Sequence, residues 1–235
     1  MALPKIETLS FEVVLPISKE KVKFRPYTVN EEKMLFIKKD LSFNEYKETV
    51  KDIIKACILE GNYPKYLVDL IFLFNHIRAK ARGEVFEAQI FCENCKQQTP
   101  IAIDIIKALK LKNFDEKKDE KIVKVNDQLT ITLETVKSTV LNEEFSEDET
   151  ILDMTYKVLK HSVKNILFNG KVFSDFTPEE FETNILNNLL PKEFEILIET
   201  VDNMPFLEYE YEVKCIHCGH SKVEREGDIS LFFGY

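Results

Sequence analysis

Hydrophobic and polar residues follow two different periods along the chain. Runs with a period of two predict β-strands, and they occur in pairs around short polar turns. The expected pairs are 11–16 with 21–27, 84–91 with 99–105, 121–125 with 128–136, and 206–214 with 221–226. The Asn169–Gly170 step is typical of a tight β-hairpin turn and predicts a further hairpin at 167–173.

Segments with the helical period lie between these hairpins. The expected helices are 28–40, 42–61, 63–83, 146–167, 177–190 and 191–204. Asn30 is placed to cap the first of them. Ser42 with Glu45, and Thr177 with Glu180, have the spacing of a capping box, in which side chain and backbone groups at the helix start bond reciprocally.

The order of elements is similar in the two halves of the chain. Each half begins with a hairpin, continues with helices and ends with a hairpin that carries Cys-x-x-Cys. We therefore expect an α+β protein with an N-terminal half at 1–111, a charged linker at 112–120 and a C-terminal half at 121–235. The likeness of "YTVNEE" to "TVLNEE" suggests an internal duplication as a hypothesis.

Composition restricts the class of protein. The 235 residues are 44% hydrophobic and 31% charged, which suffices for a packed core with a solvated surface. The formal net charge of −9 disfavours nucleic acid or an anionic membrane as partner. No apolar run approaches the length of a membrane span, and the first residues lack the pattern of a signal peptide, so we expect a soluble protein of a reducing compartment.

The two Cys-x-x-Cys motifs are the strongest chemical signal. They are "FCENCKQQ", with Cys92 and Cys95, and "KCIHCGHS", with Cys215 and Cys218. Each pair can grip one ion from a tight turn, and four thiolates complete the closed tetrahedron of a structural zinc site. We therefore predict one structural Zn²⁺ per chain, held by both pairs in a zinc-ribbon-like site that joins the two hairpins.

Other interpretations of these cysteines stay open at this point. One alternative is that the pairs are redox dithiols, and a second is that they are unmetallated cysteines in ordinary turns. A third is that His217 or His220 replaces one of the four cysteines as a metal ligand. Cys57, the fifth cysteine, falls on the apolar face of a predicted helix and is expected to be a small buried hydrophobe.

Motifs of catalysis are missing from the sequence. It contains no phosphate-binding loop, no Gly-x-Gly-x-x-Gly, no His-Glu-x-x-His and no Gly-x-Ser-x-Gly. His161 falls late in a predicted helix, where a cation suits the helix dipole. We expect a protein that is not an enzyme, without catalytic residues, cofactor-binding residues or a small-molecule substrate.

Several stretches resemble a family of baseplate hub proteins from contractile-tailed bacteriophages. They are "VVLPISKEKVKFRPYTVNEEKMLF", "DLIFLFNHIRAKARGE", "IVKVNDQLTITLETV", "FEILIETVDNMPFLEYEYEVKC" and "DISLFFGY". These segments occur in the family's order and span nearly the whole chain. The segment from Ala79 to Glu84 departs from the family pattern because it lacks a serine.

The resemblance implies a structural or assembly component of the baseplate hub. Its implied partners are other hub and tail proteins, and its implied location is the virion tail baseplate, after assembly in the host cytoplasm. The apolar "LFF" near the C-terminus is expected to pack on this chain or on a partner. The alternative is a zinc-ribbon nucleic-acid-binding or transcription-type module, which would require a basic stripe beside the cysteines.

Overall fold

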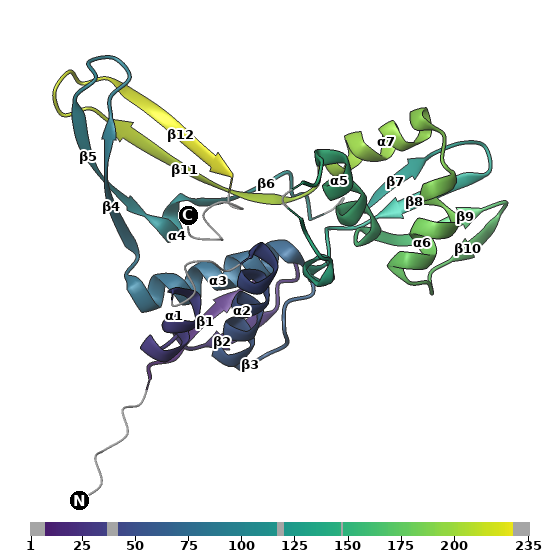
Figure 1. Ribbon diagram of the computed structural model, residues 1–235, viewed down its shortest axis with the longest axis horizontal. Helices are drawn as coiled ribbons and strands as arrows, with labels where there is room; N and C mark the ends of the chain where they lie inside the picture. Colours follow the sequence, from purple (N-terminus) through teal and green to yellow (C-terminus); the bar gives the residue numbers. More distant parts are fainter. Residues whose placement is uncertain (1–7, 37–41, 117–119, 147, 228–235) are drawn as a thin grey trace, which may run out of the picture. The chain divides into compact units, whose positions relative to one another are not determined.

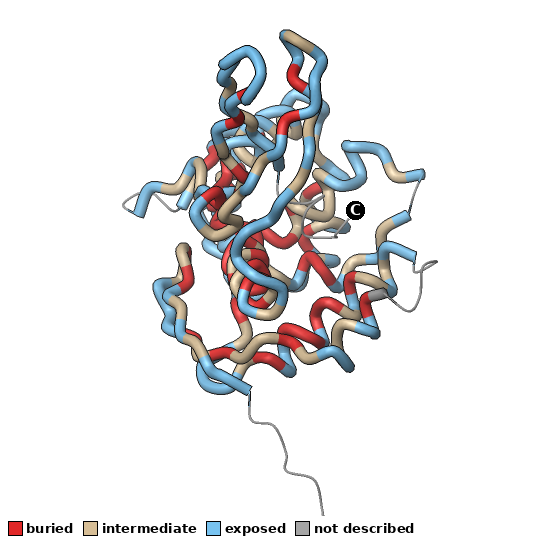
Figure 2. The backbone as a smooth tube through the Cα atoms, turned by 90° about the vertical axis from the view of Figure 1, so that its left-hand side faces the viewer, coloured by how far each residue is buried: buried red, intermediate tan, exposed pale blue. Residues whose placement is uncertain are grey.

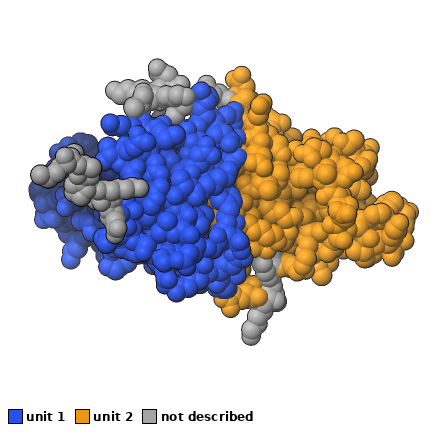
Figure 3. Space-filling view, turned by 90° about the horizontal axis from the view of Figure 1, so that it is seen from below, with its two compact units in different colours: residues 1–63, 71–112, 207–235 blue, residues 64–70, 113–206 orange. Residues whose placement is uncertain are grey.

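A computed structural model describes residues 8–36, 42–116, 120–146 and 148–227 of the chain. The described residues form both helices and sheets, as the α+β prediction requires, and their contacts divide the chain into two units (Figure 3). Unit 1 contains residues 1–63, 71–112 and 207–235, and unit 2 contains residues 64–70 and 113–206. The "LFF" segment lies outside the described residues.

The expected halves at 1–111 and 121–235 divide the chain by sequence order, whereas these units divide it by contacts. The two divisions differ in two places: residues 207–235 of the expected C-terminal half belong to unit 1, and residues 64–70 of the expected N-terminal half belong to unit 2. Contacts do not decide whether the halves arose by duplication, so the duplication stays a hypothesis.

The body of unit 1 is a small antiparallel sheet with helices. Its strands pair in the order β1-β2-β3. The elements are β1 (Phe11–Val14), β2 (Lys21–Phe24), β3 (Ile58–Glu60), α1 (Val29–Phe36), α2 (Phe43–Cys57) and, from residue 71 on, α3 (Leu67–Arg82) (Figure 1). Its core contains fully buried side chains from these elements, among them Phe24, Ile53, Ile54, Leu73 and Ile77. Figure 2 colours the backbone of buried residues red.

Two helix ends in unit 1 differ from the sequence expectation. Asn30 does not cap α1; Thr28 does, because its hydroxyl accepts from the backbone N–H of Glu31 (3.4 Å) while the Glu31 carboxylate accepts from the Thr28 backbone N–H (2.7 Å). Helix α2 has the predicted Ser42–Glu45 capping box but ends at Cys57 rather than near Gly61. Residues 58–60 form β3 instead, because their backbone groups pair with those at the edge of β2.

Two long hairpins, here called the cysteine hairpins, complete unit 1. The first consists of β4 (Val85–Phe91) and β5 (Gln98–Asp104), and the second of β11 (Phe206–Lys214) and β12 (Ser221–Gly227). Between them in the chain come α4 (Ile105–Ala108) and β6 (Leu109–Lys112), which the sequence did not predict. Strand β6 is hydrogen-bonded to β11, so the second hairpin becomes a three-stranded sheet, whereas the first keeps two strands.

Unit 2 is a four-stranded antiparallel sheet with helices, in the order β10-β9-β8-β7. Its elements are β7 (Lys121–Lys124), β8 (Leu129–Leu133), β9 (Val163–Phe168), β10 (Lys171–Phe173), α5 (Ile151–Lys160), α6 (Pro178–Asn184), α7 (Pro191–Val201) and the 3-10 turns η1 (Ser138–Asn142) and η2 (Leu186–Asn188). Both residues of the predicted Asn169–Gly170 turn have positive φ (49° and 77°), as this turn type requires. Thr177 and Glu180 form the predicted capping box of α6.

The predicted helix at 146–167 is shorter than expected. Helix α5 ends at Lys160, and residues 163–168 form strand β9. His161 caps the end of α5 and is buried, with its Nδ1 2.8 Å from the Thr139 hydroxyl and its Nε2 2.8 Å from the Glu143 carboxylate. These contacts hold His161 against Thr139 of η1 and Glu143 just after it, and the residues that follow join the sheet as β9.

Candidate metal centre

Each Cys-x-x-Cys motif lies at the tip of one cysteine hairpin. Pairing of the first hairpin ends at Phe91 with Gln98, and pairing of the second ends at Lys214 with Ser221. The strands fix where each tip begins, and the tip itself contains both cysteines of the pair. The predicted strand–turn–strand context of both motifs is therefore confirmed.

The two tips have the same backbone structure. Equivalent hydrogen bonds close them: Cys92 N to Gln97 O (2.9 Å), Lys96 N to Cys92 O (2.8 Å), Cys215 N to His220 O (2.8 Å) and Gly219 N to Cys215 O (3.0 Å). The residue after the second cysteine has a left-handed backbone in both tips, with φ of 59° at Lys96 and 72° at Gly219. This turn brings the second sulfur of each pair back beside the first.

The four sulfurs of the two tips lie together. All lie within 4.8 Å of one another, with Cys92 Sγ 3.7 Å from Cys218 Sγ and Cys95 Sγ 3.6 Å from Cys215 Sγ. A tetrahedral ion with metal–sulfur bonds of about 2.3 Å separates its ligands by about 3.8 Å. A disulfide would need about 2.05 Å, and all four cysteines are free thiols. The cluster has the size that a metal ion needs.

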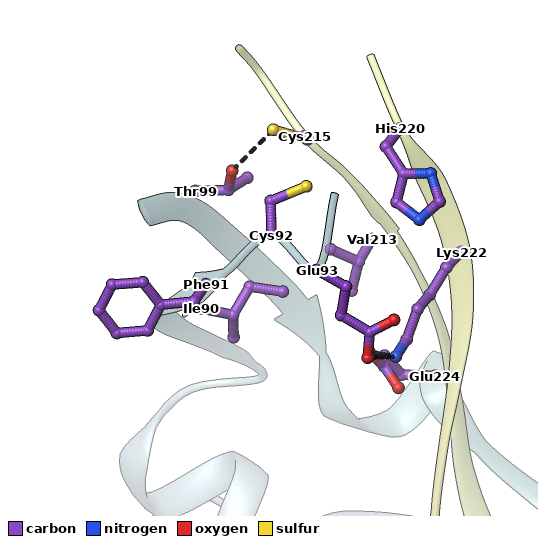
Figure 4. A pocket seen from close by; sticks show the side chains of 10 residues that line it. All are labelled: Ile90, Phe91, Cys92, Glu93, Thr99, Val213, Cys215, His220, Lys222 and Glu224. Carbon is purple, nitrogen blue, oxygen red and sulfur yellow. Dashed lines mark hydrogen bonds and ion pairs between the residues drawn. The ribbon is translucent and has the colours of Figure 1, made fainter. Parts of the chain in front are cut away.

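Neighbouring groups stabilise negative charge on the second pair. The buried Thr99 hydroxyl donates to Cys215 Sγ (3.3 Å), and Figure 4 shows it directed at that sulfur. This bond, together with backbone N–H groups of the tip, lowers the pKa of Cys215 to about 5. The His220 backbone N–H and the Asn94 side chain (3.6 Å) lower the pKa of Cys218 in the same way.

Cys95 behaves oppositely in the metal-free cluster. The Gln97 backbone N–H lowers the pKa of its thiol, but burial and hydrogen bonds with the neighbouring thiols outweigh this and raise it to about 12. Four sulfurs this close cannot all carry charge unless a cation lies among them. Metal binding to the cluster would therefore release protons, as it does at cysteine sites in general.

The two histidines of the second tip take no part in the cluster. His217 Nε2 lies 3.0 Å from the Gln98 carbonyl oxygen and so joins the two hairpins by a hydrogen bond. His220 lines a water-sized cavity of about 20 Å³ behind the cysteines. Among the described residues the cluster consists of cysteines alone, which argues against a histidine ligand.

An ion pair also joins the first tip to strand β12 of the second hairpin. Lys222 of β12 lies 2.6 Å from Glu93 of the first tip and 2.8 Å from Glu224 (Figure 4). The charges beside the cluster are therefore of both signs. Cys57 lies apart from it, fully buried in α2, where burial raises its pKa to about 12, as expected of a buried hydrophobic cysteine.

Sequence reasoning identified all four clustered thiols but missed the groups that support them. Nothing in the pattern of the sequence marks Thr99, Asn94 or Lys222 as neighbours of a metal site. That the four cysteines hold a metal stays a prediction.

Comparison with known proteins was made on the whole chain. Residues 7–234 match the family model described as "T4 bacteriophage base plate protein". Neither a curated protein nor a solved structure gives a match. In the described part of the chain, no helix has the length and apolar character to cross a membrane. Because the match extends over nearly all of the sequence, the chain belongs to the T4 bacteriophage base plate protein family and is a structural protein of the phage baseplate.

Proposed function

We propose that this protein is a structural or assembly component of the baseplate hub of a contractile tail. Family membership supports a baseplate role, and the resemblance of five ordered segments to hub proteins supports the hub in particular. The protein would act through contacts with other hub and tail proteins rather than through a chemical reaction. It would assemble in the host cytoplasm and function in the virion tail.

The exposed apolar side chains support a role in protein contacts. The cysteine hairpins expose large hydrophobic residues to solvent: Val85, Phe86, Phe91, Ile216 and Val223. Unit 2 exposes others: Ile122, Ile151, Leu152, Val172 and Leu190. Exposed apolar side chains become favourable when a partner covers them.

Within this function we propose that the four cysteines hold one structural Zn²⁺. The observation that carries this proposal is that sulfurs 120 positions apart, Cys95 and Cys215, lie 3.6 Å from each other at matching hairpin tips. Four thiolate ligands fill a tetrahedral zinc and leave no position for water or substrate, so such an ion stabilises structure. A two-stranded hairpin is marginally stable alone, and the ion would fasten the first hairpin to the second.

A nucleic-acid-binding zinc ribbon is the alternative function, and the charges near the cluster give it no support. Lys222 is paired with Glu93 and Glu224, and the net charge of the chain is −9. A reader of nucleic acid presents unpaired basic residues to phosphate.

Native mass spectrometry with elemental analysis tests the zinc. We expect one zinc per chain, lost in Cys92→Ser and equally in Cys215→Ser because each removes one of four shared ligands. Cys57→Ala is the matched control, since Cys57 lies outside the cluster, and it should keep its metal. Retention of zinc by either ligand variant would disprove the shared site, and so would metal-free wild-type protein from zinc-supplemented cells.

The hub role is tested on assembly intermediates from infected cells. We expect the protein to sediment with hub-sized intermediates and to be identified there by mass spectrometry. Occurrence only in peripheral baseplate intermediates or in tail-tube fractions would overturn the hub assignment. The zinc result is independent of this outcome.

A further inference from the structure

Strand β4 is an edge strand with unusual exposure. It pairs only with β5 among the described residues, so its other edge faces no strand. Its sequence VFEAQIF contains one charge and neither glycine nor proline, and Val85, Phe86 and Phe91 are each more than half exposed. A long exposed edge of this composition pairs readily with another strand, and native proteins normally protect such edges.

The other free edges of the cysteine hairpins are protected. Strand β5 contains Pro100, which has no backbone N–H to offer an incoming strand. Strand β12 has four charged residues among its seven, Lys222, Glu224, Arg225 and Glu226. Protection is therefore missing from β4 alone among these hairpin edges, which favours a pairing role for it.

The hydrogen bonds to β5 show which groups of β4 face outward. Cys92 N donates to Gln97 O (2.9 Å) and Ile105 N donates to Glu84 O (2.8 Å), so even-numbered residues of the first strand bond to β5. In an antiparallel pair such residues alternate with residues whose backbone groups point away. The backbone groups that point to the free edge belong to Val85, Glu87, Gln89 and Phe91.

The side chains of β4 are chemically palindromic about Ala88. Antiparallel pairing across a two-fold axis at Ala88 places Glu87 opposite Gln89 of the second copy and Phe86 opposite Ile90 of the second copy. It also places Val85 opposite Phe91 of the second copy. Every outward-facing residue then meets another outward-facing residue, so the backbone ladder is complete. Aromatic residues opposite β-branched ones are favourable cross-strand pairs.

We propose that β4 pairs with β4 of a second copy of this chain in this register. The first cysteine hairpin of each copy then forms one continuous sheet with that of the other. Neighbouring registers that preserve the ladder are worse. An axis at Glu87 puts two glutamates directly opposite each other, and an axis at Gln89 puts Glu87 opposite Phe91 of the second copy. The charge and apolar pattern thus favours this chain itself as the occupant of the edge.

Substitutions at Gln89 test the register by their opposite effects on the dimer. In the proposed register, residue 89 of each copy faces Glu87 of the other copy. Gln89→Glu therefore puts two negative charges face to face at each of these pairs, whereas Gln89→Lys puts a positive charge against a negative one. With the zinc-loaded protein in sedimentation equilibrium, we expect Gln89→Glu to weaken and Gln89→Lys to tighten dimerisation, each by about two- to thirtyfold. Gln98→Glu and Gln98→Lys are matched controls, because Gln98 lies on β5 and outside the proposed contact, and they should change dimerisation little.

A cross-link gives an independent test of the axis. In the proposed register Ala88 lies opposite Ala88 of the second copy, and the two are not hydrogen-bonded to each other. The Cα atoms of such a pair are about 4.5 Å apart, which is within the range of a disulfide. Under mild oxidation, Ala88→Cys should form a covalent dimer that reducing agent reverses, whereas Ala102→Cys on β5 and the parent chain should not. A parent chain that stays monomeric up to its solubility limit would overturn the proposal, as would Gln89 variants that shift dimerisation in the same direction.

Discussion

The side chain of Thr99 shows how a residue outside the ligand set shapes the cluster. It is fully buried, and its hydroxyl has the Cys215 sulfur within 3.3 Å. A hydrogen bond to the charged form of an acid lowers its pKa, so Thr99 favours the thiolate that a metal requires. The cysteines of the second tip therefore favour the thiolate form that binds a cation.

A second residue-scale feature is the ion pair of Arg25 with Glu31 at the start of α1. The guanidinium donates to both carboxylate oxygens (2.8 and 2.6 Å), and the Thr28 backbone N–H donates to one of them (2.7 Å). Arg25, and with it the Thr28 donors, outweigh burial and lower the pKa of Glu31 to about 2. The pair joins the end of β2 to α1.

This shift predicts a pH-dependent contribution to stability. Because the folded-state pKa of Glu31 is depressed, its stabilisation is complete above pH 4.5 and is lost as the pH falls towards 2. The shift corresponds to about 3 kcal/mol, and after a reduction for solvent screening we expect Glu31→Gln to lower the free energy of unfolding by about 2 kcal/mol at pH 7. Urea titrations at several pH values should show the difference from wild type shrinking below pH 4.5; a constant difference would contradict the assignment.

At the scale of elements, the two hairpin tips solve one geometric problem with different residues. Each needs a left-handed residue after its second cysteine, and the second tip uses glycine where the first uses Lys96. A residue with a Cβ is strained in this conformation by about 1 kcal/mol, and glycine is not. A Cβ at Gly219 would contact nothing within 4 Å, so strain there would come from the backbone alone.

Reciprocal substitutions at the tips should therefore have opposite signs. Lys96→Gly should stabilise the zinc-loaded protein by about 0.5 kcal/mol, and Gly219→Ala should destabilise it by about 1 kcal/mol. Guanidinium titration of metal-loaded samples measures both. Destabilisation by Lys96→Gly would mean that the lysine side chain contributes more at this tip than its backbone strain costs.

At the scale of the whole molecule, contacts group segments that are distant in the chain. Residues 207–235 belong to unit 1 with residues 71–112, although all of unit 2 except residues 64–70 lies between them in sequence. The proposed zinc would therefore act inside unit 1, where it would join the two hairpins whose tips carry its ligands. The proposed β4 pairing would add a symmetric contact from the same unit.

Local signals in the sequence predicted most elements of this fold. Capping boxes at Ser42 and Thr177 and the Asn169–Gly170 turn are formed by contacts within a few residues, and the predicted hairpin strands pair with the next strand in the chain, so both are visible in the sequence. The ends of α2 and α5 were placed too late, because β3 and β9 take their hydrogen bonds from distant strands. The short β6 was missed for the same reason.

The sequence by itself determined the four cysteines as one candidate site, because thiolate spacing in a turn is a local property. It also determined the family, through ordered resemblances along the chain. Tertiary structure decided that Thr99 and Asn94 contact the sulfurs, that the second hairpin joins unit 1, and that no strand among the described residues pairs with the outer edge of β4. These features depend on which distant segments meet, and that is settled by burial and backbone pairing across the whole fold rather than by neighbouring residues.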